Sequence, residues 1–257
     1  MLPAIFVGHG SPMNALGDNG FTQGWRAIAA SMPKPKAILA ISAHWQTDGP
    51  RVTIAEQPKT IHDFGGFPRE LMEVQYPAPG SRALAERVAA LLQPEIVHGD
   101  GQWGLDHGTW SVLVHLYPEA DVPVVQLSLD LRRSPLEHLD LARRLRPLRN
   151  EGVLILGSGN LVHNLRRYDW RDPYAEPHEW AVSFEAKARK LIDERAFETL
   201  ANYEALGAEA MLSSPTPEHF LPLIYILAQH ENGEQISFPV SGFEGRAVSM
   251  LSVKVGA

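Results

Sequence analysis

The chain has 257 residues, of which 44% are hydrophobic and 21% charged, and its formal net charge is −7. That length is enough for one large domain with a sizeable core. The acidic balance argues against nucleic acid or an anionic membrane as a partner, because proteins that bind these usually have a basic face. With no cysteine in the chain, disulfides, thiolate zinc sites and cysteine nucleophiles are excluded.

The N-terminal sequence "MLPAIFVGHGSP" lacks the basic start and long apolar stretch of a signal peptide. No run of about 18 apolar residues is available to cross a bilayer. We therefore expect a cytoplasmic protein. The sequence gives no indication of oligomeric state.

Short apolar runs typical of buried strands recur along the chain, alternating with amphipathic patterns typical of helices. The strand-like runs cover residues 4–7, 37–42, 51–55, 123–129, 152–159, 236–240 and 247–253. The helical patterns cover residues 81–92, 134–148, 177–196 and 216–230. Strands that are apolar throughout are covered on both faces, so we predict a single α/β domain over residues 1–257. Its central sheet should be mixed and mostly parallel, flanked by helices, with the last two strands antiparallel at one edge.

Three histidines follow predicted strands: His9 in "FVGHGSP", His44 in "LAISAHWQ" and His163 in "LILGSGNLVHNL". Because ligands of open α/β sheets bind outside the carboxyl ends of the strands, these side chains can converge at one end of the sheet. His107 lies in a glycine-rich loop, and His219 lies near the start of the last predicted helix. Without cysteine, a transition-metal site here must use imidazole and carboxylate.

The other histidines carry less information. His62 lies in a long irregular stretch, residues 62–81, that has the character of a lid and could contact a substrate. The remaining histidines lack a flanking motif, and we interpret them as surface or core residues: His98, His115, His138, His178 and His230. The "GSGN" sequence at 157–160 lacks the third glycine and the basic residue of a phosphate loop, and no serine lies in a nucleophile-elbow pattern.

Six motifs in register, "GHGSPM", "ISAHW", "HDFGGFP", "LDHGTW", "GSGNLVHNL" and "PTPEHFLPL", resemble the class III extradiol ring-cleaving dioxygenases. The resemblance is closest to the 4,5-DOPA extradiol dioxygenase branch and covers nearly the whole chain. It implies an α/β domain with a metal in a cleft at one end of the sheet. It also implies cleavage of a catechol beside its two hydroxyls with incorporation of O₂ and typically Fe(II).

Carried over by this resemblance, His9 and His44 are metal ligands, His163 is the acid–base histidine and His107 lines the substrate pocket. More distant relatives use a glutamate as third ligand, whereas this chain has Glu218 beside His219. The branch that it resembles uses the histidine, and we assign His219. Adjacent helical residues point about 100° apart, which argues against both binding one ion. His163 is retained in two roles, as base or as fourth ligand.

A site of three or four histidines also suits zinc, which lies above iron in the affinity order. We therefore expect zinc in the isolated protein and Fe(II) in the active one. Candidate substrate contacts are His62, Trp45, Trp110 and Phe67 of the loop 64–67. Two alternatives remain open at this point: a zinc-dependent hydrolase using the same histidines, and a metal-binding protein without activity.

Overall fold

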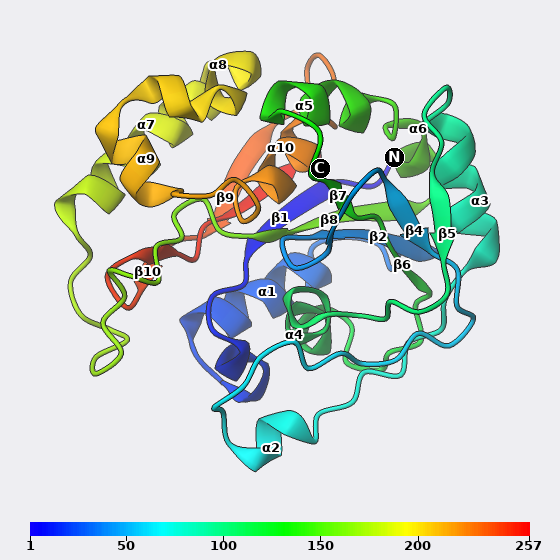
Figure 1. Cartoon of the computed structure of the whole chain (residues 1–257), viewed down its shortest axis with the longest axis horizontal. Helices are drawn as coiled ribbons and strands as arrows, with labels where there is room; N and C mark the ends of the chain where they lie inside the picture. Colours follow the sequence, from blue (N-terminus) through cyan, green and yellow to red (C-terminus); the bar gives the residue numbers. More distant parts are fainter.

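A six-stranded sheet forms the centre of the computed structural model, which describes all residues from 1 to 257 (Figure 1). Its strand order is β6-β2-β8-β1-β12-β9. The first four of these strands are parallel to one another, whereas β12 is antiparallel to both β1 and β9. The sheet strands are β1 (Ala4–Gly8), β2 (Ala37–Ser42), β6 (Val124–Gln126), β8 (Val153–Gly159), β9 (Ile236–Val240) and β12 (Ser252–Val255). The predicted single α/β domain with a mixed, mostly parallel sheet is confirmed.

Three two-stranded sheets surround this centre and account for the strand predictions that were wrong in detail. They pair β3 (Gln46–Thr47) with β7 (Leu129–Asp130), β4 (Arg51–Thr53) with β5 (His98–Asp100), and β10 (Phe243–Glu244) with β11 (Val248–Ser249). The run at 51–55 therefore belongs to a small separate sheet. The run at 247–253 is divided between β11 and the central strand β12, and the run at 123–129 is divided between the central strand β6 and β7.

Helices cover both faces of the central sheet, with α5 and α10 above it and α1 and α4 below it in the view of Figure 1. The helices are α1 (Gly20–Ala30), α2 (Arg69–Met72), α3 (Arg82–Leu91), α4 (His107–Leu116), α5 (Pro135–Arg143), α6 (Pro147–Asn150), α7 (Glu179–Asp193), α8 (Phe197–Ala201), α9 (Ala208–Ser213) and α10 (Leu221–Leu227), with the 3-10 helices η1 (Pro12–Leu16) and η2 (Tyr203–Leu206). None of them combines the length and the apolar composition that a membrane crossing requires.

Alternate residues of the central strands enter two different hydrophobic cores. In β1, Ala4 and Phe6 belong to the larger core, whereas Ile5 and Val7 belong to the other. Successive strand side chains point to opposite faces of a sheet, so β1 is buried on both. This explains why its sequence is apolar throughout and why its polar histidine comes only after the strand ends.

Two site histidines lie in local structures other than those predicted. His107 is the first residue of α4 rather than part of a loop, because the Asp106 side chain accepts the Thr109 N–H and caps the helix. His219 precedes α10 and lies in a turn, because Pro222 favours the first turn of the helix. The helix predicted over 134–148 is likewise divided into α5 and α6, and α6 begins at Pro147.

The buried His138 side chain connects α5 to α10, the helix that follows His219. Its Nε2–H donates to the Asp130 carbonyl oxygen at 3.2 Å, so in the neutral ring Nδ1 accepts the Tyr225 hydroxyl at 3.0 Å. Burial lowers the pKa of His138 to about 4 from an ordinary value of 6.5.

The pKa of His138 predicts loss of stability in acid. As the pH is lowered from about 6.5 to about 4, His138 is protonated in the unfolded chain but still neutral in the folded chain. The free energy of unfolding should therefore decrease over this range. His138 contributes up to about 3 kcal/mol of this loss. Urea unfolding at several pH values, compared with His138→Gln, isolates this contribution, because the variant should show the shallower dependence. Parallel profiles for the two proteins would contradict the assignment.

Candidate active site

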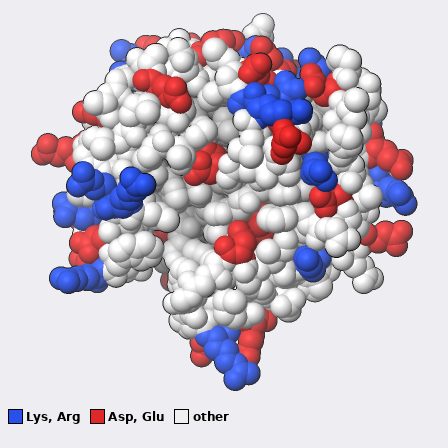
Figure 2. All heavy atoms as spheres, in the orientation of Figure 1, with Lys and Arg blue, Asp and Glu red and all other residues white.

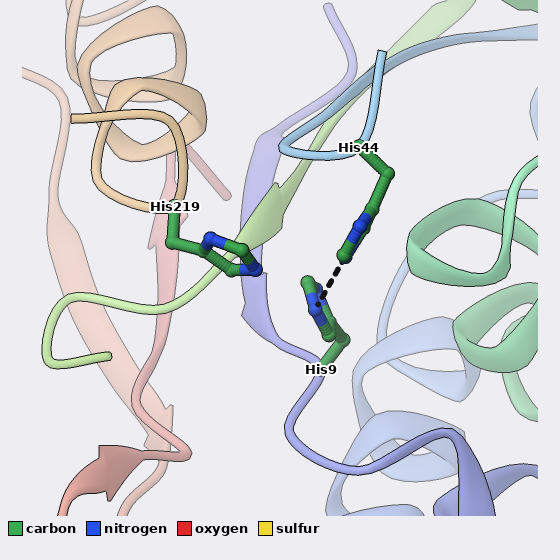
Figure 3. A group of neighbouring side chains, drawn as sticks. All are labelled: His9, His44 and His219. Atoms are coloured by element: carbon green, nitrogen blue, oxygen red, sulfur yellow. Dashed lines mark hydrogen bonds between the residues drawn. The ribbon is translucent and has the colours of Figure 1, made fainter. Parts of the chain in front are cut away.

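Three histidines meet at one end of the central sheet (Figure 3). His9 follows β1 and His44 follows β2, and both strands run parallel to β8 between them. Their carboxyl ends therefore lie at the same edge of the sheet. His219 reaches the same point from the turn before α10, and the potential ligand atoms of the three side chains all lie within 4.8 Å of one another.

The turn that carries His219 lies directly on the end of β8. The Asn160 N–H donates to the His219 carbonyl oxygen at 2.8 Å. A Cβ on Gly159 would overlap that same oxygen, so only glycine allows so close an approach here. The glycines of "GSGN" thus bring the turn onto the strand, which explains the motif without a bound phosphate.

Ser158 fixes the tautomer of His9. The Ser158 hydroxyl donates its single hydrogen to the Gly108 carbonyl oxygen, and its oxygen lies 3.0 Å from His9 Nδ1. The hydroxyl can therefore only accept from this histidine, which places the imidazole hydrogen on Nδ1. His9 Nε2 is left with a free lone pair directed at the other two histidines.

Carboxylates orient the other two rings in the same way. His219 Nδ1 lies 3.2 Å from Glu218 Oε1, and His44 Nδ1 lies 3.5 Å from Asp63 Oδ2. The Glu218 carboxylate oxygen accepts a hydrogen bond from His219, so Nδ1 of that ring carries the hydrogen and Nε2 carries the lone pair. The longer ion-pair contact between Asp63 and His44 Nδ1 favours the same arrangement in His44. Glu218 thus contacts the outer nitrogen of His219, which agrees with its exclusion as a ligand beside that histidine.

The inner nitrogens fit a metal ion. His9 Nε2 and His44 Nε2 are 3.2 Å apart, and two nitrogens that bind one ion at about 2.1 Å lie about 3.0–3.4 Å apart. His219 Nε2 is buried without a hydrogen-bond partner. Burial lowers the pKa of all three imidazoles, that of His44 to about 3, so they are neutral ligands. These residues form a three-histidine centre suited to a divalent metal.

Asp63 contacts two histidines at once, a role that the sequence interpretation missed. Besides His44, its carboxylate accepts the backbone N–H of His107 at 2.9 Å and lies 3.0 Å from His107 Nδ1. Burial alone would raise the pKa of Asp63, but its contacts with His107 and His44 lower it to about 2, so it is ionised. The sequence could have indicated Asp63 as a site residue, because it follows His62 in the motif "HDFGGFP".

The histidine centre forms the floor of a pocket of about 220 Å³. In Figure 2 the hollow near the middle of the face is bordered chiefly by uncharged atoms and a few acidic groups. The pocket is lined by His9, Gly10, Ser11, Pro12, His44, Phe64, Phe67, His107, His163, Leu165, Tyr168, Trp170, His219 and Val248. All five predicted site histidines and Phe67 are therefore brought together in one pocket.

Three other predicted contacts lie outside the pocket lining. Trp45 is buried and stacks on Trp103 with 5.6 Å between ring centroids. His62 Nε2 bonds to the Val74 carbonyl oxygen, and its ring packs against Phe64 and Trp110. His62 and Trp110 thus support the pocket wall from behind, because Phe64 occupies the inner position. The sequence interpretation also missed Tyr168 and Trp170, which belong to the pocket lining.

Comparison with known proteins agrees with this arrangement. Residues 3–246 match the family model described as the catalytic LigB subunit of aromatic ring-opening dioxygenase. The chain belongs to this family. It is 47% identical to the 4,5-DOPA dioxygenase extradiol of Escherichia coli (strain K12), over 99% of this chain and 95% of that protein. It is 38% identical to the protein of the same name from Beta vulgaris, over 97% and 95% of the two chains.

A solved structure confirms the fold. The crystal structure of the uncharacterized protein JW3007 from Escherichia coli K12 superposes with a TM-score of 0.85 at 41% identity, covering 100% of both chains. The protein is therefore a metal-dependent extradiol dioxygenase that acts on a small aromatic molecule with O₂. This membership decides against the hydrolase and the inactive metal-binding protein that the histidines alone left open.

In this dioxygenase His163 is stacked on His219, with 3.5 Å between ring centroids and 7° between ring planes. A histidine binds a metal in the plane of its ring, and two nearly parallel stacked planes do not meet near either ring. The stacking therefore favours the acid–base role of His163 over the fourth-ligand role, although the ligand atoms of His163, Glu218 and His219 also lie within 4.8 Å of one another.

Replacing Asp63 by Asn should weaken metal binding by about 10- to 100-fold, because the carboxylate that orients His44 is lost. The measurement is competition between the protein and a chelator of known affinity. Asp121→Asn is the matched control, because Asp121 pairs with Lys34 on the surface and its loss should change nothing. Equal affinities of the two variants would contradict the role of Asp63.

Proposed function

We propose that this dioxygenase opens the ring of a catechol such as DOPA, using Fe(II) held by His9, His44 and His219. The observation that carries the proposal is the set of three imidazole lone pairs, two from buried side chains and one from the partly exposed His44, on the floor of a pocket with aromatic walls. The relatives named 4,5-DOPA dioxygenase support DOPA as a substrate. Iron, when bound, supplies the redox chemistry that activates O₂, which zinc cannot supply.

His163 is proposed as the base that takes a proton from a catechol hydroxyl. Its ring borders the pocket, and its nitrogens have no hydrogen-bond partner within the protein. Burial lowers the pKa of His163 to about 4, so its ring is neutral near pH 7 and has a lone pair available. Stacking on His219 holds the ring beside the metal site.

His107 is proposed to contact the substrate from another side of the metal. Its ring packs on His44, with 3.9 Å between centroids, and meets the Phe64 ring edge-on at 5.3 Å. The loop that contains Phe64 and Phe67 then forms an apolar wall for the catechol ring and limits access of water. The two additional imidazoles, His107 and His163, thus flank the metal from the His44 side and the His219 side.

Zinc fits the same three nitrogens, and we keep the prediction that isolated protein contains it. A reducing cytoplasm, the predicted compartment, would keep iron in the ferrous state. Protein reconstituted anaerobically with Fe(II) should consume O₂ when DOPA or caffeate is added and form a yellow ring-opened product. The zinc-loaded protein is the matched control and should consume none. Iron-loaded protein that consumes no O₂ with any catechol would refute the proposal.

His163→Ala should lower kcat by at least about 100-fold, because general-base catalysis is lost. The variant should still bind about one metal ion per chain, since the proposal assigns His163 as a base and not as a ligand. Metal analysis and O₂ uptake measured on the same sample separate the two effects. His98→Ala, an exposed histidine on β5, is the control and should match the wild type. Loss of the metal from His163→Ala would instead make His163 a ligand.

A further inference from the structure

A second hollow of about 320 Å³ adjoins the metal pocket. The two hollows adjoin along four shared lining residues: Ser11, Phe67, Tyr168 and Trp170. Beyond these, the second hollow is lined by Met13, Asn14, Gly17, Asn19, Phe21, Pro173, Tyr174 and Glu244. Its chemistry differs from that of the metal pocket, because it contains no histidine and only one charged side chain, that of Glu244.

Glu244 lacks a positively charged partner. Its Oε2 accepts the Ser11 N–H at 2.8 Å, but no lysine, arginine or histidine acts on its carboxylate. Burial raises the pKa of Glu244 above its ordinary value. Hydrogen bonds from the Ser11 amide and the Asn14 side chain lower it, but by less than burial raises it. A partly desolvated carboxylate of this kind is stabilised by a cation that arrives with a ligand.

Glu244 also lies next to the metal site. Its carboxylate contacts the backbone of Ser11, two residues after the ligand His9. A Cβ on Gly10 would overlap Glu244 Oε2, and Gly10 itself lines the metal pocket. The glycine therefore lets the carboxylate lie close to the lining of the metal pocket.

Aromatic rings line the same hollow as this carboxylate. Tyr168 and Trp170 lie 4.5 Å apart between ring centroids, and Phe21 and Phe67 complete the lining. Trp170 and Tyr174 are 67% and 78% exposed, so a ligand in the hollow can reach their rings. Aromatic faces beside a carboxylate attract ammonium groups through the ring quadrupole.

We propose that this second hollow is an amine subsite, in which Glu244 binds the protonated amine of a substrate whose catechol ring occupies the metal pocket. The inference rests on the proposed function for the catechol and adds the residue that selects among catechols. A catecholic amine or amino acid is favoured, whereas a catechol whose side chain ends only in a carboxylate is repelled by Glu244.

DOPA and 3-(3,4-dihydroxyphenyl)propanoate test the subsite, because they differ only in the amine. With iron-loaded protein, Glu244→Gln should raise KM for DOPA by about tenfold or more and leave KM for the propanoate unchanged or lower. The Gln carbonyl can still accept the Ser11 N–H, so the backbone contact is retained. Glu119→Gln, an exposed carboxylate, is the control and should leave both values unchanged. An equal change for both substrates would overturn the subsite and make Glu244 structural.

A binding measurement separates this inference from the proposed function. By calorimetry, metal-free wild-type protein should bind phenethylamine at least about tenfold more tightly than uncharged 2-phenylethanol, and Glu244→Gln should abolish the difference. This measurement does not depend on catalysis. The comparison of the two compounds on the wild type also does not depend on whether the variant folds. Absence of O₂ uptake with every catechol would refute the proposed function alone. Equal binding of the two compounds by the wild type would refute the amine subsite alone.

Discussion

The active site depends on three imidazole Nε2 atoms, those of His9, His44 and His219, which face one another in a largely buried space. None of the three carries a hydrogen that it could donate to another. The Ser158 hydroxyl and the Glu218 carboxylate accept the outer hydrogens of His9 and His219, and the Asp63 carboxylate lies beside the outer nitrogen of His44. An acceptor buried without a partner costs about 1–3 kcal/mol, so the folded protein is stabilised by whatever cation relieves all three at once. The protein thus prepares its metal site through the outer nitrogens, and the same contacts keep the rings fixed during turnover.

The fold supplies this geometry from distant parts of the chain. Parallel strands deliver His9 and His44 because their carboxyl ends lie at one edge of the sheet, while β8 serves mainly as a surface on which the His219 turn rests. The Gly159 backbone allows that contact, and the buried bond between His138 and Tyr225 holds the following helix α10 in place. The three ligands therefore lie at the ends of deeply buried strands or in a turn packed on one, whereas Phe64 and Phe67 of the pocket wall come from a loop.

The parts of this arrangement that could be predicted from sequence are those set by local pattern. An apolar run ending in histidine indicates a strand and the position of its last side chain, which located His9 and His44. The start of α10 was misjudged because it depends on Pro222 and on contact with β8, so His219 lies in a turn. Trp45 was misassigned because aromatic residues serve equally well in a core, and only packing against Trp103 distinguishes the two uses.

Other features could not be predicted because they arise between segments far apart in the chain. Glu244 and Ser11 are separated by more than 200 residues, and neither lies in a motif that indicates the other. The stacking of His163 on His219, which favours a base over a ligand, likewise depends on a ring orientation that spacing does not encode.

X-ray absorption at the metal edge tests most directly whether three imidazoles form the metal site. On protein loaded anaerobically with one equivalent of Fe(II), the outer-shell scattering should correspond to three imidazoles, and His163→Ala should leave it unchanged. A spectrum that requires four imidazoles, or one that loses an imidazole in His163→Ala, would contradict the assignment of ligands and base.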